Sequence, residues 1–286
     1  MYMYWNGEIV SADEITISPF DHGYLYGMGV FETFRVYERH PFLFDDHYER
    51  LKQGLQQLNI TNQVEKDALL QGLYHLLDAN QIEDAYVRLN ISAGVGDVGL
   101  RTEPYEHPTV LMYMRPLPKD VTYPEKDGHI LRLRRNTPEG SFRLKSHHYL
   151  NNMMAKREIG SKPNIEGIFL TETGVLAEGI VSNLFWVQDG IVYTPSVDTG
   201  ILNGITRQFI LEMCQKLSII VKEGHFSKQE MKLADEAFIT NSIQEIVSLK
   251  SIDGRVLPED KRLKSMLQTY YHQNRTTLWA KQQFQK

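Results

Sequence analysis

A lysine near the middle of the chain stands where amine chemistry is favoured. Lys145 lies in the run SFRLKSHHYLNN, and apolar residues from Tyr149 onward recur at helical spacing, so we expect Lys145 at or just before the first turn of a helix. The sequence offers it no local anion, and the positive end of a helix disfavours a second positive charge. Both effects lower the pKa of an amine, as Schiff-base chemistry requires. A solvated surface lysine would show the same pattern, so both interpretations remain open.

The stretch from Glu178 to Arg207 combines a carboxylate with a helix start. Its sequence, EGIVSNLFWVQDGIVYTPSVDTGILNGITR, is typical of strand, turn, strand, loop and helix. Gly204, Ile205 and Thr206 begin the helix and offer backbone amides, a small hydroxyl and the positive end of the helix dipole, which suit a phosphate group. Many helix starts have these features and bind nothing, so the phosphate site is a hypothesis.

Two residues of the first half have both a structural and a functional interpretation. Arg50 lies beside the apolar stripe of a predicted helix over 45–60 and next to Gly54, where a side chain can reach inward. A solvated surface arginine is the simpler interpretation. His22 lies in a loop flanked by proline and glycine, with no second ligand at metal-type spacing. We therefore expect it to form a hydrogen bond that stabilises the loop.

Arginines also occur on two predicted strands. In the strand over 85–94, apolar residues alternate with polar ones, and Arg88 lies on the polar face, which lines either a pocket or solvent. Arg132, Arg134 and Arg135 lie in the run HILRLRRNTPEG, which begins at His129 and is typical of a strand and a turn. They form either an anion-binding patch or the exposed side of a half-buried strand.

The order of predicted elements indicates an α/β (α+β) fold of two domains. Helices over 45–60 and 64–79 intervene between the early strands, whereas the second half has several short strands before its helices, typical of a barrel-like sheet. The proline-rich run PLPKDVTYPEKDG is the best linker. We predict a small domain over 1–116, a linker over 117–127 and a larger domain over 128–286.

Composition narrows the class of protein. The chain has 286 residues, 42% of them hydrophobic, and a net charge of −5, which argues against nucleic acid or an anionic membrane as partner. Its one cysteine, Cys214, excludes an intrachain disulfide and lies on an apolar helix face, where we expect a buried thiol. The start of the chain does not resemble a signal peptide, and no apolar run approaches the roughly 18 residues needed to span a bilayer. We expect a cytoplasmic protein.

The stretch that begins at Glu178 resembles the signature of the class IV aminotransferases, the fold-type IV family of enzymes that depend on pyridoxal 5'-phosphate (PLP). In that signature a glutamate precedes an Asn-aliphatic-aromatic triplet, a Thr-Pro strand end and a Gly-Ile-x-Arg helix start. The matching residues here are Glu178, Asn183-Leu184-Phe185, Thr194 and Gly204-Ile205-Thr206-Arg207. The resemblance continues through FDHGYLYGMGVFETFR, HYERL, LKSHHYL and FITNS, and so covers most of the chain. It implies a smaller N-terminal α/β domain, a larger C-terminal domain with a barrel-like sheet and surrounding helices, and a homodimer.

The resemblance also implies the roles of single residues. Lys145 is the lysine that bonds covalently to PLP, and Glu178 hydrogen-bonds the pyridine nitrogen. A carboxylate there keeps the nitrogen protonated, so that the ring can accept electrons. The phosphate is bound, by the same resemblance, by Arg50, Ile205 and Thr206, and by Asn241 or Ser242.

Within the family, the runs SPFDHGYLYGMGVFETFR and NTPEGSFRLKSHHYLNNMMAKREI most resemble the aminodeoxychorismate lyases. Branched-chain enzymes carry Gly-Gly-Asn-Tyr after the lysine, where this chain has Ser-His-His-Tyr. D-amino-acid enzymes place a tyrosine where Phe31 stands, and an arginine and a histidine in the loop occupied here by GVGDVGLR. The resemblance thus implies conversion of 4-amino-4-deoxychorismate to 4-aminobenzoate and pyruvate, a step of folate biosynthesis. Because that substrate has two carboxylates, Arg88 and Arg101 are candidate contacts, with Phe31 at the substrate side.

Two other functions remain open. A class IV aminotransferase acting on D-amino or branched-chain amino acids with 2-oxoglutarate would share the lysine, the glutamate and the phosphate site. A PLP carrier without catalysis is disfavoured by the presence of both Lys145 and Glu178. The product formed from an amine substrate would separate these functions.

Overall fold

The computed structural model describes residues 1–61 and 64–285. The chain forms two compact units, Met1–Val121 with Leu144–His148, and Thr122–Arg143 with Tyr149–Lys286. The division after Val121 falls inside the predicted linker, 117–127. The predicted second domain, 128–286, differs from the structure, which places residues 144–148 in the first unit.

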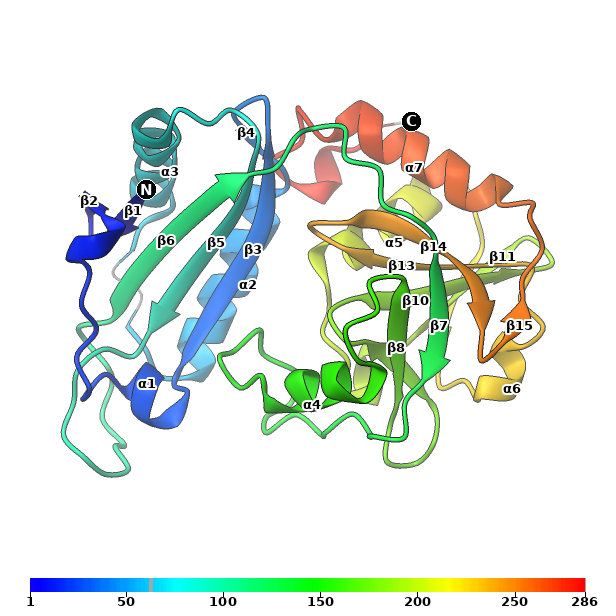
Figure 1. The fold of residues 1–286 in the computed structure, drawn as a ribbon, viewed down its shortest axis with the longest axis horizontal. Coiled ribbons are helices and arrows are strands. Elements are labelled where there is room, and N and C mark those ends of the chain that lie inside the picture. Colours follow the sequence, from blue (N-terminus) through cyan, green and yellow to red (C-terminus); the bar gives the residue numbers. More distant parts are fainter. Residues whose placement is uncertain (62–63, 286) are drawn as a thin grey trace. The chain divides into compact units, whose positions relative to one another are not determined.

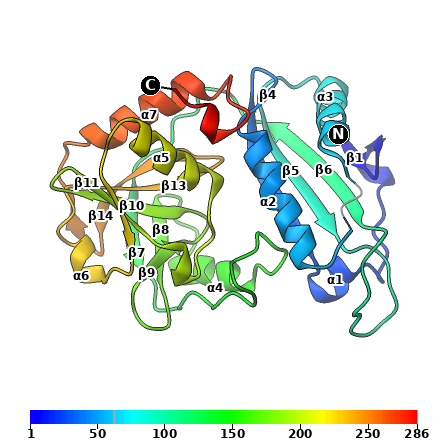
Figure 2. The same ribbon diagram turned by 180° about the vertical axis from the view of Figure 1, so that it is seen from behind.

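The first unit is a sheet with helices packed against it. Helix α2 runs along strand β3, and Figure 2 shows it in front of the sheet. Among the described residues the sheet has six strands in the order β2-β1-β6-β5-β3-β4. The elements are β1 Tyr2–Trp5, β2 Glu8–Ser11, η1 Ala12–Glu14, α1 His22–Tyr26, β3 Gly29–Tyr37, β4 His40–Pro41, α2 Phe44–Gln57, α3 Lys66–Asn80, β5 Ala85–Ser92 and β6 Thr109–Pro116.

Strand β5 has two different faces. Ala85, Val87, Leu89 and Ile91 are buried, whereas the residues between them are only half-buried. Because side chains alternate along a strand, one face of the sheet belongs to the core and the other is polar. Arg88 lies on the polar face, as the sequence pattern predicts.

Residues 144–148 add an extended segment to the edge of this sheet. Phe31 N donates to Lys145 O at 2.9 Å and His147 N donates to Gly29 O at 3.0 Å, on either side of the Val30–Ser146 bridge. These bonds explain why the segment joins the first unit. They also correct the predicted position of Lys145, because the next helix, α4, begins only at Leu150. The positive helix end therefore does not act on this lysine, since that effect is confined to about the first turn.

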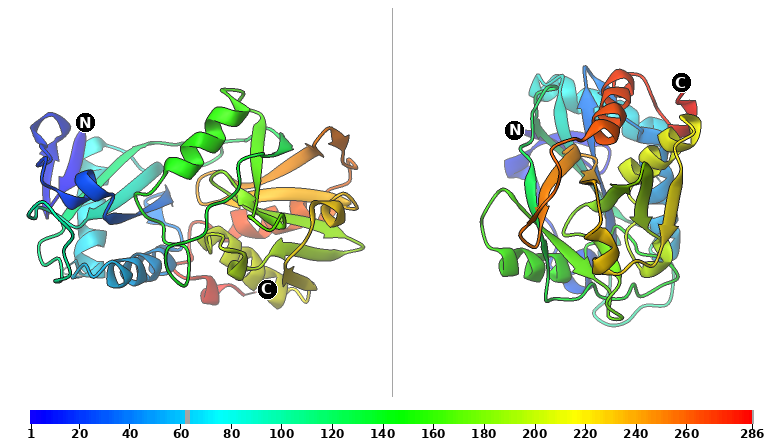
Figure 3. Two further views of the ribbon diagram at one scale, coloured as in Figure 1. Left: turned by 90° about the horizontal axis from the view of Figure 1, so that it is seen from below. Right: turned by 90° about the vertical axis from the view of Figure 1, so that its right-hand side faces the viewer.

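The second unit is built on a longer sheet. Its strand order, in the part of the chain that is described, is β12-β11-β10-β13-β14-β7-β8-β9, with β15 paired to β14. Helices α5 and α7 pack against β13 (Figures 1 and 3). The elements are β7 Lys126–Ile130, α4 Leu150–Ile159, β8 Ile165–Leu170, β9 Leu176–Gly179, β10 Asn183–Gln188, β11 Ile191–Pro195, η2 Val197–Thr199, α5 Ile205–Lys216, β12 Val221–Gly224, α6 Lys228–Met231, β13 Glu236–Asn241, β14 Glu245–Ile252, β15 Arg255–Val256, α7 Arg262–Asn274 and η3 Lys281–Gln283.

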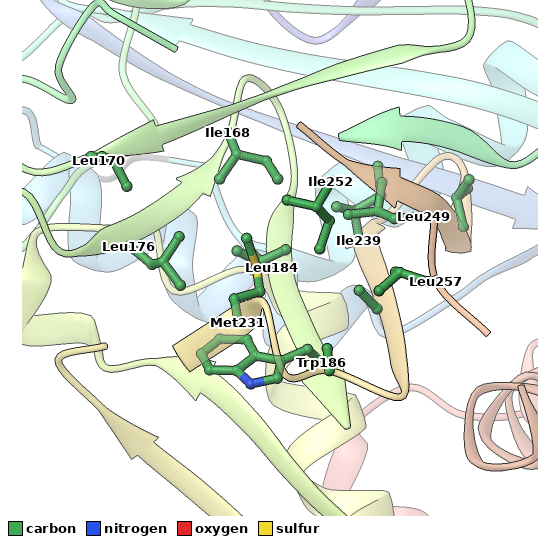
Figure 4. Packing of buried hydrophobic residues seen from close by; sticks show 13 residues of the cluster. Ile168, Leu170, Leu176, Leu184, Trp186, Met231, Ile239, Leu249, Ile252 and Leu257 are labelled. Carbon is green, nitrogen blue, oxygen red and sulfur yellow. The ribbon is translucent and has the colours of Figure 1, made fainter. Parts of the chain in front are cut away.

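The longer sheet curls, as the predicted barrel-like sheet requires. Leu176 N, on the last strand β9, donates to Phe226 O, just beyond the first strand β12, at 2.7 Å. The concave side encloses apolar side chains from several strands, among them Ile168, Leu184 and Trp186 (Figure 4). Burying these side chains supplies most of the driving force that holds the curled sheet together. The α/β (α+β) fold class is thus confirmed.

Two predictions outside the site have a clear outcome. Cys214 is fully buried on α5, and burial raises the pKa of its thiol to about 12, so the predicted structural thiol is confirmed. His22 is buried as well, with Nδ1 at 2.8 Å from the Tyr105 hydroxyl and Nε2 at 2.9 Å from the Asp97 carbonyl. Its ring stabilises the loop, as expected. Within the described ranges, no helix is both long enough and apolar enough to cross a membrane.

Candidate active site

Glu178 is a buried carboxylate with a fixed orientation. It lies on β9 and is 4% exposed. Its Oε1 accepts a hydrogen bond from Arg135 Nε at 2.8 Å, and its Oε2 accepts one from the Leu202 backbone amide at 3.0 Å. Arg143 adds a second positive charge, with Nε 3.7 Å from Oε1. An ion pair and a backbone amide therefore orient this carboxylate, and an ionised carboxylate can accept further hydrogen bonds.

The hydrogen bond from Leu202 N to Glu178 links this carboxylate to the segment that leads into α5. Asn183 Nδ2 donates to Leu202 O at 2.8 Å and so holds the approach to the helix. Gly204 is the N-cap and contributes no side-chain cap. A Cβ at this position would lie 2.1 Å from Asn183 Oδ1, which explains the glycine. The first backbone amides of α5 are thus left without a side-chain acceptor from the cap residue, as an anion site requires.

Two hydroxyl groups meet beside this helix start. Thr206 is buried in the first turn of α5, and its Oγ1 lies 3.4 Å from Ser242 Oγ, just beyond β13. Asn241 has a different task, because its Oδ1 accepts from the amides of Ile243 and Gln244 at 3.0 and 2.8 Å. The side-chain oxygen of Asn241 shapes the turn that presents Ser242. Within the second unit, Glu178 thus binds the approach to α5 through Leu202 N, and Thr206, next to Ile205 in the first turn, lies beside Ser242.

Lys145 lies with aromatic and cationic side chains on the first unit. Its Nζ is 4.5 Å from the centre of the Phe31 ring. Arg88 Cζ lies 3.6 Å from the same ring centre, while Arg88 Nε donates to Asn90 Oδ1 at 3.0 Å. Phe31 is therefore a common neighbour of the two cations. The structure brings together three sequence-predicted residues here, the lysine and two substrate candidates.

The two histidines after Lys145 fit against two glycines. A Cβ added to Gly29 would lie 2.5 Å from Cε1 of His147. A Cβ added to Gly27 would lie 2.5 Å from Cδ2 of His148, so each ring needs a glycine beneath it. The His147 ring also stacks near Phe31, with ring centres 6.3 Å apart. Burial, followed by the charge of Arg88, lowers the pKa of His147 to about 4. A neutral imidazole thus packs the lysine segment against β3.

Arg50 is held by a buried carboxylate that the sequence did not single out. Glu32 is 1% exposed and accepts from Arg50 Nε at 2.8 Å and from Arg50 Nη2 at 2.6 Å. His47 Nδ1 lies 2.6 Å from the same carboxylate. Burial raises the pKa of Glu32, but Arg50 and His47 outweigh it and lower the pKa to about 2. The guanidinium of Arg50 reaches inward, as the functional interpretation requires.

Arg101 does not join the Lys145 group by any contact within the described residues. Its side chain is exposed, donates to Pro104 O at 2.9 Å and packs 5.3 Å from the Tyr105 ring centre. Of the two arginine candidates for substrate, Arg88 has the surroundings of a site residue. Arg101 belongs to an exposed loop.

Comparison with known proteins identifies the family. Residues 29–252 match the family described as amino-transferase class IV. The chain is 52% identical to the aminodeoxychorismate lyase of Bacillus subtilis, over 88% of this chain and 86% of that protein. It is 29% identical to the D-alanine aminotransferase of Bacillus licheniformis, over 94% of this chain and 96% of that one. The branched-chain amino acid aminotransferase of Escherichia coli has a similar structure, with a TM-score of 0.85, 27% identity, and coverage of 96% of this chain and 94% of that chain. The chain therefore belongs to the class IV aminotransferase family of PLP-dependent enzymes.

Proposed function

We propose that the protein is a 4-amino-4-deoxychorismate lyase, which forms 4-aminobenzoate and pyruvate. The observation that carries the proposal is the 52% identity to the Bacillus subtilis lyase, against 29% to the Bacillus licheniformis D-alanine aminotransferase. As a step of folate biosynthesis, this reaction would take place in the cytoplasm.

The residues of the two units suit PLP. A primary amine at Lys145, a buried carboxylate at Glu178 and the glycine-capped start of α5 match an aldehyde, a pyridine nitrogen and a phosphate in chemical type. Arg50, Ile205, Thr206, Ser242 and the turn made by Asn241 would bind the phosphate. When bound, PLP supplies an electron sink that stabilises negative charge next to the substrate nitrogen.

Lys145 would act as base and then as acid. Its Nζ would take the proton from C4 of the substrate and return a proton to the departing enolpyruvyl group, directly or through a water. Glu178, held by Arg135, would keep the ring nitrogen protonated. Arg88, 3.6 Å from the Phe31 ring centre, would hold a substrate carboxylate, and Phe31 would pack against the substrate ring. Arg101 would contribute only if the loop that carries it reaches the substrate.

The test is product identity. PLP-loaded protein should convert aminodeoxychorismate to 4-aminobenzoate, followed by its fluorescence, with pyruvate released in equal amount. Formation of glutamate from 2-oxoglutarate with no pyruvate would instead establish the aminotransferase. Protein that binds PLP and turns over neither type of substrate would contradict both activities.

A further inference from the structure

Arg135 is a buried cation outside the set of residues assigned to the cofactor. Its side chain is 8% exposed, and its guanidinium lies 5.2 Å from the Phe169 ring centre. Arginine is rarely buried unless it is paired. Its partner is Glu178, reached from Nε at 2.8 Å.

Neutral groups fix the other side of the guanidinium. Arg135 Nη1 lies 2.8 Å from Asn151 Oδ1, 3.2 Å from Asn152 Oδ1 and 3.3 Å from Asn136 Oδ1. Asn151 and Asn152 lie in the first turn of α4. Their amide nitrogens donate to the backbone carbonyls of Arg134 and Ile180, which leaves their oxygens directed at the arginine. A ring of amides thus holds Arg135 in one orientation.

This arrangement fixes Glu178 in turn. Among the described residues, Glu178 is the carboxylate that pairs with Arg135, and Arg143 lies farther from the same oxygen, at 3.7 Å. Leu202 N binds the second carboxylate oxygen, and Leu202 leads directly into the start of α5. The orientation of Glu178 is therefore set by α4 on one side and by the approach to α5 on the other.

We propose that Arg135 is a positioning residue that acts on the pyridine nitrogen of PLP through Glu178. By pairing with the carboxylate, it orients Glu178, so that Glu178 can hold the proton on the nitrogen. This inference rests on the proposed function for the assignment of Glu178 to that nitrogen.

The test compares Arg135→Gln, Arg135→Lys and the control Arg134→Gln, which changes an exposed neighbour on the same segment. Two quantities are measured on reconstituted protein, the PLP dissociation constant and the pH midpoint of the absorption spectrum of the bound cofactor. Arg135→Gln should weaken PLP binding by about 10- to 100-fold, the usual range for a hydrogen bond to a charged group. It should also shift the spectral midpoint, Arg135→Lys should give an intermediate result, and Arg134→Gln should match wild type.

A double-mutant cycle separates this role from a purely structural one. If Arg135 acts through Glu178, Arg135→Gln should add little to the spectral change and the loss of affinity already caused by Glu178→Gln. Additive effects of the two substitutions would overturn the proposal. So would an Arg135→Gln protein with wild-type affinity and spectrum.

A milder variant covers the case in which Arg135→Gln does not fold. Asn151→Ala removes one amide acceptor and keeps both charges. It should change the spectrum and affinity in the same direction by a smaller factor, and an unchanged spectrum would contradict the proposal. Wild-type protein that does not bind PLP would overturn the proposed function, whereas wild type that binds and variants that match it would overturn only this inference.

Discussion

The backbone of Lys145 is fixed by a hydrogen bond to β3, and its amine lies near the Phe31 ring. Lys145 O accepts from Phe31 N, and Nζ lies 4.5 Å from the Phe31 ring centre. Replacing its side chain should therefore preserve the fold and remove the chemistry. We expect Lys145→Ala to lose the absorption of covalently bound PLP and to lower kcat at least about 100-fold, the low end for a proton-transfer group.

The control is Lys162→Ala, an exposed lysine of the second unit that should behave as wild type. A Lys145→Ala protein that keeps the wild-type absorption would show that another amine bonds to the cofactor.

The shifted pKa of His147 should make the stability of the folded protein depend on pH. Its pKa is lowered from 6.5 to about 4, first by burial and then by Arg88. Between these values the unfolded chain binds a proton that the folded chain does not, so stability should fall as pH falls from 6.5 to 4. We expect His147→Phe, which keeps a ring over Gly29, to show a smaller fall in melting temperature over this range.

Circular dichroism melts at several pH values measure this effect. His75→Phe, on the exposed side of α3, serves as the control and should follow wild type. Parallel pH profiles for wild type and His147→Phe would rule out the assignment.

At the residue scale, the family signature singled out side chains that the structure places in two groups, one in each unit. In the second unit Thr206 lies beside Ser242, and in the first unit Lys145 lies with Phe31 and Arg88. The pairing of Arg135 with Glu178 was not predicted, because the sequence gives no signal that, of Arg132, Arg134 and Arg135, only the last is buried. Its partners Glu178 and Asn151 are distant in sequence, and a single sequence does not record such pairing.

At the scale of elements, the packing of residues 144–148 against β3 requires a glycine at position 29. A Cβ on Gly29 would lie 2.5 Å from His147 Cε1 and 2.8 Å from Ile91 O. Both contacts are too close, and Ile91 O belongs to a central strand that cannot move easily. We expect Gly29→Ala to destabilise the protein by about 1–3 kcal/mol, as overpacking does, and to weaken PLP binding through displacement of Lys145.

Urea unfolding and PLP titration measure the two effects. The matched change is Gly224→Ala in the second unit, where the nearest neighbour of the added carbon would be the Phe226 ring, at 3.0 Å. If the two variants bind PLP equally well, Gly29 does not position the lysine.

Elements were predictable where the signal was local. The alternating strand β5 and the helix α5 follow from the periodicity of apolar residues, and the structure has both. The predicted position of Lys145, at the first turn of a helix, was wrong. Periodicity detects the helix that begins at Leu150, but it does not detect the pairing of residues 144–148 with β3. That pairing depends on backbone hydrogen bonds, to which side-chain patterns contribute little.

At the scale of the whole molecule, we propose a homodimer on the basis of the family resemblance. Sedimentation equilibrium should give a mass twice the 33.2 kDa of one chain. Dilution over a wide range should leave this mass unchanged if the dimer is permanent. A mass of one chain at micromolar concentration would contradict the proposal.

The insertion of residues 144–148 has a consequence for how the enzyme becomes competent. The chain leaves the first unit after Val121, returns at Leu144 and departs again at Tyr149. A fragment that ends at Val121 has the strand that seats the lysine but no lysine, and a fragment that begins at Thr122 has the lysine but no strand to seat it. During synthesis, the first unit is therefore still incomplete when its own last strand has been made. Seating the lysine therefore requires both parts of the chain, and neither fragment by itself holds Lys145 against β3.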